Sequence, residues 1–338
     1  MKILVTGGTG YIGSHTVVEL QKKGYEVVIA DNLSNSTADV VDNIARITGI
    51  KPAFEKVDLS DPEPCRDLFN RHPGLASVIH FAAFKAVGES VLEPLKYYHN
   101  NLGSLMNLLR EIETHGIRNL VFSSSCTVYG QPDELPVTES APIKKAASPY
   151  GNTKQIAEEI INDIVAVTEL RAIMLRYFNP IGAHESALIG ELPLGIPNNL
   201  VPFLTQTAIG KRDFLRVWGN DYNTHDGTAI RDYIHVVDIA LAHVIAIERL
   251  QEGKNKTKAE AFNLGTGIGY SVLDVIKSFE RSTKVKVAYK IMDRRPGDVE
   301  KVWADTELAN HELGWKAGRD LDDMTLSAWN WEKKLAGL

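Results

Sequence analysis

The stretch that decides the fold is LVTGGTGYIGSHTVVEL, residues 4–20, close to the start of the chain. Gly7, Gly10 and Gly13 lie between a short β-branched run and a segment with helical apolar spacing, and Gly8, Gly10 and Gly13 also satisfy the GxGxxG pattern. Glycine is needed where a backbone turns sharply, approaches a pyrophosphate and lets a helix pack against a strand. The N-terminus of the following helix offers free N–H groups to a phosphate. This stretch therefore predicts a dinucleotide-binding strand, turn and helix.

A carboxylate follows the glycine turn at the expected distance. The second apolar run, residues 27–30, ends at Asp31. A carboxylate about 20 residues beyond such a turn binds the ribose hydroxyls of NAD. Because Asp31 would repel a 2'-phosphate and no arginine adjoins it, the sequence favours NAD over NADP.

Strand-like and helix-like segments alternate along the chain. The expected strands are residues 3–6, 27–30, 53–57, 78–81, 120–123 and 172–177, and the expected helices include residues 13–23, 102–114 and 149–168. Alternation of this kind predicts right-handed βαβ units. The expected fold class is therefore α/β: a doubly wound parallel-sheet Rossmann domain with a smaller α/β substrate-binding domain.

Two domains are expected, and the chain should cross between them more than once. After about residue 180 the sequence becomes rich in Gly, Pro and Asn, which is typical of loops covering a substrate. Segments 232–242 and 261–264 again read as core helix or strand. We expect residues 1–180, with about 232–265, to form the NAD-binding domain, and residues 181–231 with about 266–338 to form the substrate domain.

Composition excludes several classes of partner. The chain has 338 residues and a formal net charge of −6, which offers no basic stripe for nucleic acid or an anionic membrane. Neither a membrane-spanning apolar run nor a secretory signal is visible, so a soluble, cytoplasmic protein is expected. The two cysteines, Cys65 and Cys126, form no disulfide framework, and Cys126 reads as a packing residue. The ten histidines lack metal-ligand spacing, so no metal is predicted.

A candidate catalytic group combines the expected fifth strand with the helix that follows it. That strand ends in three serines, the last being Ser125, and SPYGNTK comes later at residues 148–154. Ser148 can cap a helix in which Tyr150 and Lys154, four residues apart, share one face. An ammonium and a bound nicotinamide cation would favour the Tyr150 phenolate, a general base. A Tyr and Lys pair at this spacing is usually an exposed helical pair, but the glycine turn and the serine-ended strand favour the catalytic interpretation.

Ten runs together resemble the extended short-chain dehydrogenase/reductase superfamily and, within it, the UDP-glucose 4-epimerase family. They span nearly the whole chain in the family's order. The runs are VTGGTGYIGSHT, ADNLSNS, HFAAFKAVGES, SSSCTVYG, SPYGNTK, LRYFNPIGAH, IPNNLVPF, DGTAIRDYIHVVDIA, NLGTGIGYSVLDV and RRPGD.

The resemblance implies an NAD site and a UDP-sugar site. The implied NAD residues, besides the catalytic Ser125, Tyr150 and Lys154, are Gly7, Gly10, Tyr11, Ile12, Gly13, Asp31, Asn32, Leu33, Ser34, Asn35, Ser36, Asp58, Leu59, Phe81, Ala82, Ala83, Lys85, Asn100 and Phe178. The implied substrate residues are Lys85, Ser125, Tyr150, Asn179, Asn199, Leu200, Trp218, Arg231, Arg295, Asp298 and Val302. Arginine forks suit a diphosphate in charge and direction.

The implied activity is inversion of C4 of a UDP-hexose, interconverting UDP-glucose and UDP-galactose. Tyr150 would take the proton of the 4-hydroxyl while hydride passes to NAD, and hydride would return to the other face of the turned 4-keto sugar. Related dehydratases carry Thr-Asp-Glu where this chain has Ser125, Cys126 and Thr127, so the acid and base for dehydration are missing. A reductase is disfavoured by Asp31, and a silent NAD sensor would not need the catalytic residues.

Two further expectations follow from the resemblance. Many bacterial members have a tyrosine where this chain has Val302, so a smaller side chain should leave room for an acetamido group and allow activity on UDP-N-acetylglucosamine and UDP-N-acetylgalactosamine. Related enzymes are usually homodimers joined through a helical bundle, which residues 102–114 and the helix after Pro149 could supply.

Overall fold

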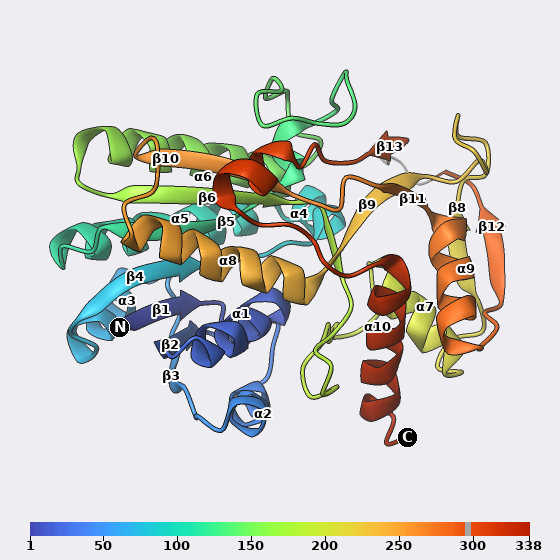
Figure 1. Ribbon diagram of the computed structural model, residues 1–338, viewed down its shortest axis with the longest axis horizontal. Helices are drawn as coiled ribbons and strands as arrows, with labels where there is room; N and C mark the ends of the chain where they lie inside the picture. The colour runs from blue at the N-terminus through green and yellow to red at the C-terminus, as the bar shows by residue number, and fades with distance from the viewer. Residues whose placement is uncertain (295–298) are drawn as a thin grey trace.

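The computed structural model describes residues 1–294 and 299–338. Its centre is a seven-stranded parallel sheet in the order β10, β6, β5, β4, β1, β2, β3 (Figure 1). The strands are β1 (Lys2–Thr6), β2 (Glu26–Asp31), β3 (Ala53–Lys56), β4 (Leu75–His80), β5 (Asn119–Ser125), β6 (Arg171–Tyr177) and β10 (Ala259–Leu264). The predicted doubly wound parallel sheet is confirmed.

Helices cover both faces of this sheet, because successive strand residues point to opposite sides. On one face, Ile3 and Val5 pack with α1 (Tyr11–Lys22), α2 (Asp39–Thr48) and α8 (Val236–Gln251). On the other face, Leu4 packs with α3 (Pro62–Arg71), α5 (Pro94–Thr114) and α6 (Pro149–Val167). The short α4 (Val87–Leu92) contacts α5 and α6.

The rest of the chain forms smaller sheets around a separate core (Figure 1). One sheet joins β7 (Asn179–Ile181), β9 (Ile230–His235), β11 (Gly269–Ser271) and β13 (Lys301–Val302), and another pairs β8 (Leu215–Trp218) with β12 (Tyr289–Met292). Helices α7 (Leu200–Ala208), α9 (Val272–Thr283) and α10 (Leu321–Leu335) pack on the separate core. The chain also contains η1 (Cys126–Tyr129) and η2 (Ala309–Leu313).

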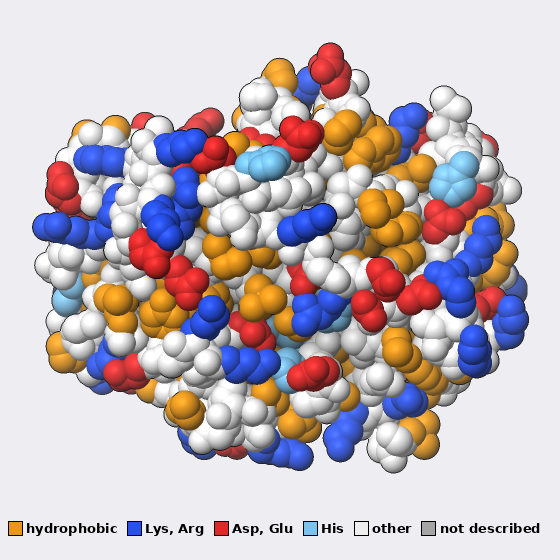
Figure 2. All heavy atoms as spheres, viewed as in Figure 1, with side chains coloured by type: hydrophobic (Ala, Val, Ile, Leu, Met, Phe, Trp, Pro, Cys, Tyr) orange, Lys and Arg blue, Asp and Glu red, His pale blue; other side chains and the backbone are white. Residues whose placement is uncertain are grey.

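The chain returns to the large sheet after β7 and β8. Segment 232–242, expected as core helix or strand, is the end of β9 followed by the first turns of α8, and segment 261–264 lies in β10 beside β6. No helix in the described parts of the chain combines the length and apolar character needed to span a membrane. On the face drawn in Figure 2, acidic and basic side chains are interspersed.

Candidate active site

The glycine turn after β1 is shaped by backbone contacts that exclude a side chain. Gly7 has φ +67, and a Cβ there would lie 2.8 Å from the Ala82 backbone nitrogen. A Cβ on Gly13 would lie only 2.2 Å from the Gly7 carbonyl oxygen, so α1 can approach the turn this closely only with glycine. The turn thus presents backbone N–H groups at the start of α1. Tyr11 anchors this helix by donating a hydrogen bond to the Gly182 carbonyl at 2.6 Å.

Asp31, at the end of β2, is buried beside the turn. It accepts hydrogen bonds from the Thr9 N–H at 3.2 Å, the Leu33 N–H at 2.9 Å and the Ser36 hydroxyl at 3.3 Å. Leu33 has φ +62, so the loop reverses sharply there. One carboxylate therefore fixes both the glycine turn and the loop that carries Asn32, Leu33, Ser34, Asn35 and Ser36.

Other predicted NAD residues lie at the same edge of the sheet. Asn32 donates to Asp58 at 3.1 Å, and Leu59 is buried next to Asp58. Burial alone would raise the pKa of Asp58. Hydrogen bonds from Ser60 and Asn32 outweigh that effect and lower the pKa, so the carboxylate stays ionised.

The loop after β4 carries the predicted NAD residues Phe81, Ala82, Ala83 and Lys85, and it lies at the same edge of the sheet. The Ala82 N–H donates to the Thr6 hydroxyl at 3.3 Å, which holds the loop against β1. The Phe84 N–H donates to Asn101 at 2.8 Å, and Asn100 donates to the same Asn101 oxygen at 2.9 Å. Phe178 is buried directly after β6.

The predicted catalytic residues meet at the end of β5. Ser148 caps α6 through a 3.1 Å bond from the Gly151 N–H, which places Tyr150 in the first turn. The Ser125 side chain lies next to the Tyr150 hydroxyl, close enough to lower the pKa of that hydroxyl. Lys154 is buried, donates to the Ser123 carbonyl at 2.6 Å and lies 4.7 Å from the centre of the Phe122 ring. The tyrosine, lysine and serine thus form one group, as the sequence predicted.

The protonation of Tyr150 differs from the expectation that the Lys154 ammonium favours its phenolate. Burial raises the pKa of Tyr150 to about 12, although the neighbouring Ser125 side chain acts in the opposite direction. Burial also lowers the pKa of Lys154 to about 8, partly opposed by the Glu158 carboxylate. The chain's own groups therefore keep Tyr150 protonated, because burial outweighs the effect expected of the Lys154 ammonium. A nicotinamide cation bound beside the ring would act in the opposite direction.

The Glu191 carboxylate contacts two predicted substrate residues that come from separate segments of the chain. Glu191 accepts a hydrogen bond from Asn199 at 2.6 Å and lies 3.4 Å from the Lys85 ammonium. Its backbone carbonyl accepts a 2.9 Å bond from the Trp331 indole. Lys85 and Asn199 were predicted, but Glu191 was missed, because a single acid in the loop between β7 and α7 has no pattern of its own. Leu200 follows Asn199 as the first residue of α7.

The remaining predicted substrate residues lie on the smaller sheets. In β9, Arg231 pairs in register with Val302 of β13 and carries a side chain close enough to lower the pKa of Cys126. Burial dominates at Cys126 and raises its pKa to about 12. Asn179 pairs with Tyr233, and Trp218 ends β8 in a different sheet. Arg295 and Asp298 lie outside the described residues.

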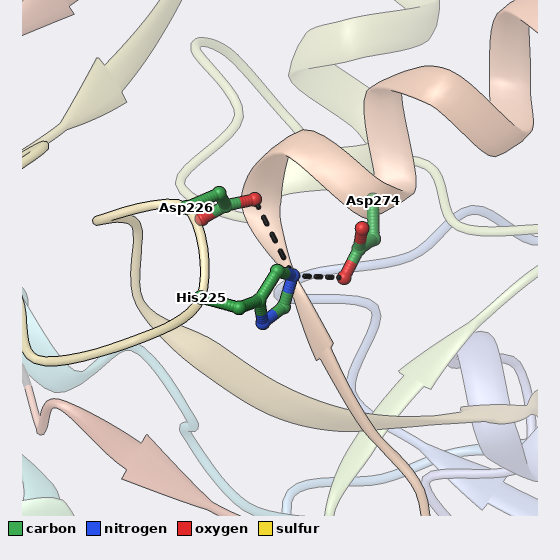
Figure 3. A group of neighbouring side chains, drawn as sticks. All are labelled: His225, Asp226 and Asp274. Carbon is green, nitrogen blue, oxygen red and sulfur yellow. Dashed lines mark ion pairs between the residues drawn. The ribbon is translucent and has the colours of Figure 1, made fainter.

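A histidine and two aspartates that are not among the predicted site residues also lie close together (Figure 3). His225 Nε2 lies 3.0 Å from Asp274 and 3.6 Å from Asp226. Both carboxylates already serve the protein, since Asp226 accepts from Thr228 and Ser271, and Asp274 completes the capping box of α9. The cluster is explained as a brace between the loop before β9 and α9.

Comparison with known proteins agrees with this geometry. Residues 4–327 match the family model described as GDP-mannose 4,6 dehydratase. The chain is 52% identical to the UDP-glucose 4-epimerase of Bacillus subtilis over 333 residues, covering 98% of this chain and 97% of that protein.

Solved structures agree as well. The UDP-glucose 4-epimerase of Stenotrophomonas maltophila, with bound NAD and formylated UDP-arabinopyranose, superposes with a TM-score of 0.96 at 48% identity, covering 100% of this chain and 99% of that one. The enzyme of Bifidobacterium longum, in complex with NAD+ and UDP, gives 0.94 at 45% identity, covering 99% and 98%. The UDP-Glc/GlcNAc 4-epimerase of Campylobacter jejuni gives 0.84 at 35% identity, covering 98% and 99%.

A Rossmann sheet with a glycine turn, a strand-end serine and a tyrosine and lysine on one helix defines an extended short-chain dehydrogenase/reductase. Within that class, the full-length similarity is to epimerases of nucleotide sugars. The chain belongs to the UDP-glucose 4-epimerase family.

Proposed function

We propose that this protein interconverts UDP-glucose and UDP-galactose by an NAD-dependent inversion at C4. The observation that carries the proposal is the buried Tyr150 beside Ser125 at the end of β5, with Lys154 one helical turn away on α6. Relatives that carry the epimerase name match the chain over nearly its whole length, and two of their structures contain NAD.

The residues at the strand ends fit a dinucleotide. Gly7 and Gly13 let the backbone turn and pack tightly where a Cβ would collide, and the start of α1 beside this turn would bind the pyrophosphate. Asp31, held by three protein donors, faces the loop of residues 32–36 where a ribose would be bound. When bound, NAD would supply the acceptor for the C4 hydride and return it later.

The chain's own residues would handle the proton and hold the sugar. Ser125 orients the 4-hydroxyl, and Tyr150 accepts its proton on oxidation and returns it on reduction. Inversion requires the sugar to turn while UDP stays bound, so binding energy must be concentrated on the nucleotide. Arg231, Asn179, Asn199, Leu200 and Trp218 would supply that grip, with Arg295 and Asp298 as further predicted contacts.

A dehydratase is the main alternative, and it gives its name to the matching family model. Dehydration needs a carboxyl acid and base at the end of β5, where this chain has Cys126 and Thr127. Cys126 cannot replace them, because burial raises its pKa to about 12. A reductase would usually draw on NADPH, whose 2'-phosphate Asp31 disfavours.

A broader substrate range is part of the proposal. Val302 pairs with Arg231 at the edge of the second sheet, and it leaves more room than a tyrosine would. The protein should therefore accept UDP-N-acetylglucosamine and UDP-N-acetylgalactosamine as well. The Campylobacter jejuni relative is named for activity on both kinds of sugar.

The domain division, assembly and location also remain proposals. A Rossmann domain of residues 1–180 with about 232–265, and a UDP-sugar domain of residues 181–231 with about 266–338, are supported by the separate cores and by β10 joining the large sheet. A cytoplasmic homodimer is supported by two free cysteines and by exposed apolar side chains on α4 and α5. Those side chains are Val87, Val91, Leu92, Leu95 and Met106.

The decisive experiment is incubation of the purified protein with UDP-galactose and no added nicotinamide. We expect UDP-glucose to form without net accumulation of reduced nicotinamide, because the hydride returns within each turnover. Tyr150→Phe should lower the rate on the order of a thousandfold, through loss of the proton acceptor. Tyr25→Phe, which removes a hydroxyl bonded to Gln251, serves as the control and should leave the rate unchanged. A 4-keto-6-deoxy product, or full activity in Tyr150→Phe, would refute the proposal.

A further inference from the structure

A buried ion pair lies directly behind the catalytic residues. Glu158 of α6 and Arg176 of β6 meet in a two-pronged contact, with Nε to Oε1 at 2.9 Å and Nη2 to Oε2 at 2.6 Å. Their side chains are 7% and 9% exposed. Taking two charges out of water costs free energy that offsets much of their attraction. The burial of this pair is therefore not explained by its contribution to stability alone.

The pair is connected to the catalytic group from two sides. Ser124 donates to Glu158 at 2.5 Å, and Ser124 both precedes Ser125 and pairs in register with Arg176 across β5 and β6. Glu158 also follows Lys154 by four residues, as Lys154 follows Tyr150, so the three share one face of α6. One carboxylate therefore ties the serine-bearing strand to the helix that carries the base.

Arg176 extends this hydrogen-bond network toward β10, the strand at one edge of the large sheet. Its Nη1 donates to the Tyr129 hydroxyl at 2.9 Å and to the Glu139 carbonyl at 3.3 Å. Tyr129 in turn donates to Asn263 of β10 at 2.7 Å. These partners hold the guanidinium in place against the Glu158 carboxylate.

Charge adds to geometry at Lys154. Glu158 favours the ammonium form of Lys154, whereas burial lowers its pKa to about 8. Among the described residues, further ionisable groups on the surrounding elements are Tyr150 on the same helix, His80 on β4, Tyr177, which is hydrogen-bonded to Ser123, and Arg176, which is paired with Glu158. Burial lowers the pKa of His80 to about 3, so this histidine is neutral in the working range. Among the described residues, Glu158 is thus a carboxylate that favours the charged form of Lys154.

We propose that Glu158 and Arg176 are positioning residues of the epimerase reaction, which hold the strand that carries Ser125 against the helix face that carries Tyr150 and Lys154. This inference rests on the proposed function. Neither residue touches the reacting atoms, so each acts through Ser124 or Lys154.

The test compares Glu158→Gln with a matched pair elsewhere in the chain. Arg249 and Glu260 join α8 to β10 with the same two-pronged geometry, at 2.7 and 2.9 Å, and with side chains 8% and 9% exposed. In Glu158→Gln, the alkaline limb of kcat should move down by about one pH unit, and kcat should fall about tenfold with KM much less affected. Glu260→Gln should change neither quantity.

A second readout does not depend on catalysis. In protein labelled with 13C at the lysine ε-carbon, the Lys154 signal is identified by its loss in Lys154→Met. Its titration midpoint should fall in Glu158→Gln and stay unchanged in Glu260→Gln. If the wild type fails to epimerise UDP-galactose, the proposed function is wrong, and the midpoint still decides whether Glu158 controls Lys154.

If Glu158→Gln alone does not fold, a double variant still tests the inference. Glu158→Gln combined with Arg176→Met removes both charges at similar volume, so no lone guanidinium remains buried. It should melt close to the wild type and still show the lowered Lys154 midpoint. A wild-type midpoint and pH profile in the folded double variant would overturn the inference, as would identical changes in Glu260→Gln.

Discussion

At the scale of single residues, burial disfavours the charged forms of both Tyr150 and Lys154. Tyr150 is held protonated by burial, and the same burial weakens the ammonium of Lys154. A base in this state becomes effective only when a further positive charge arrives. In the proposed mechanism, formation of the Tyr150 phenolate would therefore depend on a positive charge bound next to it, which would link cofactor binding to chemistry.

Val302 carries a prediction about substrate range. Val302→Tyr would place a ring beside Arg231 on the neighbouring strand and fill the space available to a 2-acetamido group. We expect activity on UDP-N-acetylglucosamine to fall by at least about tenfold, with activity on UDP-galactose nearly unchanged, since one steric clash is worth a few kcal/mol. Rates on both substrates, measured with wild type and variant, check this. Equal losses on both, or none, would contradict it.

At the scale of elements, the glycine turn gives a second prediction. In Gly13→Ala the new methyl group would meet the Gly7 carbonyl, so α1 must move away from β1. We expect the purified variant to carry less NAD and to show reduced epimerase activity. Gly318→Ala is the control, because its methyl group would meet no atom closer than 4.0 Å. Wild-type NAD content in Gly13→Ala would show that the turn does not need close approach.

Much of the large sheet could be predicted from the sequence, because its strands are apolar runs of the right length. The run 172–177 became Arg171–Tyr177, and the run 27–30 became Glu26–Asp31. Helix α5 begins at Pro94 rather than near residue 102, because its first two turns are too polar to show helical apolar spacing. The four-residue spacing of Tyr150 and Lys154 predicted a shared helix face, and the glycine turn and the serine-ended strand were needed to predict that Ser125 lies beside them.

The smaller sheets could not be predicted in the same way. Strands such as β11 and β13 are only three and two residues long, and they exist through pairing with β9 rather than through their own composition. Glu191 was missed for a related reason, since its partners Lys85 and Asn199 come from separate segments. Contacts set by tertiary folding leave no local pattern to read.

At the scale of the whole molecule, buried histidines make stability depend on pH. Burial lowers the pKa of His15, His80 and His235 to about 3 and that of His243 to about 4. The unfolded chain binds protons at these histidines below about pH 6.5, whereas the folded chain does not. Stability is therefore complete above the unfolded pKa and is lost as pH falls toward the folded values.

Lowering the pH from about 7.5 to about 5.5 should cost about 1.4 kcal/mol of unfolding free energy for each of these histidines. Urea unfolding at the two pH values measures the loss. His243→Phe removes one titrating ring but keeps the contact with Phe81, whose ring centre lies 4.6 Å away. This variant should lose correspondingly less stability on acidification. An unchanged pH dependence would show that His243 titrates normally in the folded protein.

The position of β10 has a consequence for synthesis of the chain. β6 is an edge strand until β10 pairs with it, and β10 ends at residue 264. On the ribosome, the nascent first half therefore carries an unprotected strand edge while the next eighty or so residues are translated. Translation speed through that interval, or a chaperone that shields the edge, would thus govern how much polypeptide reaches the native state.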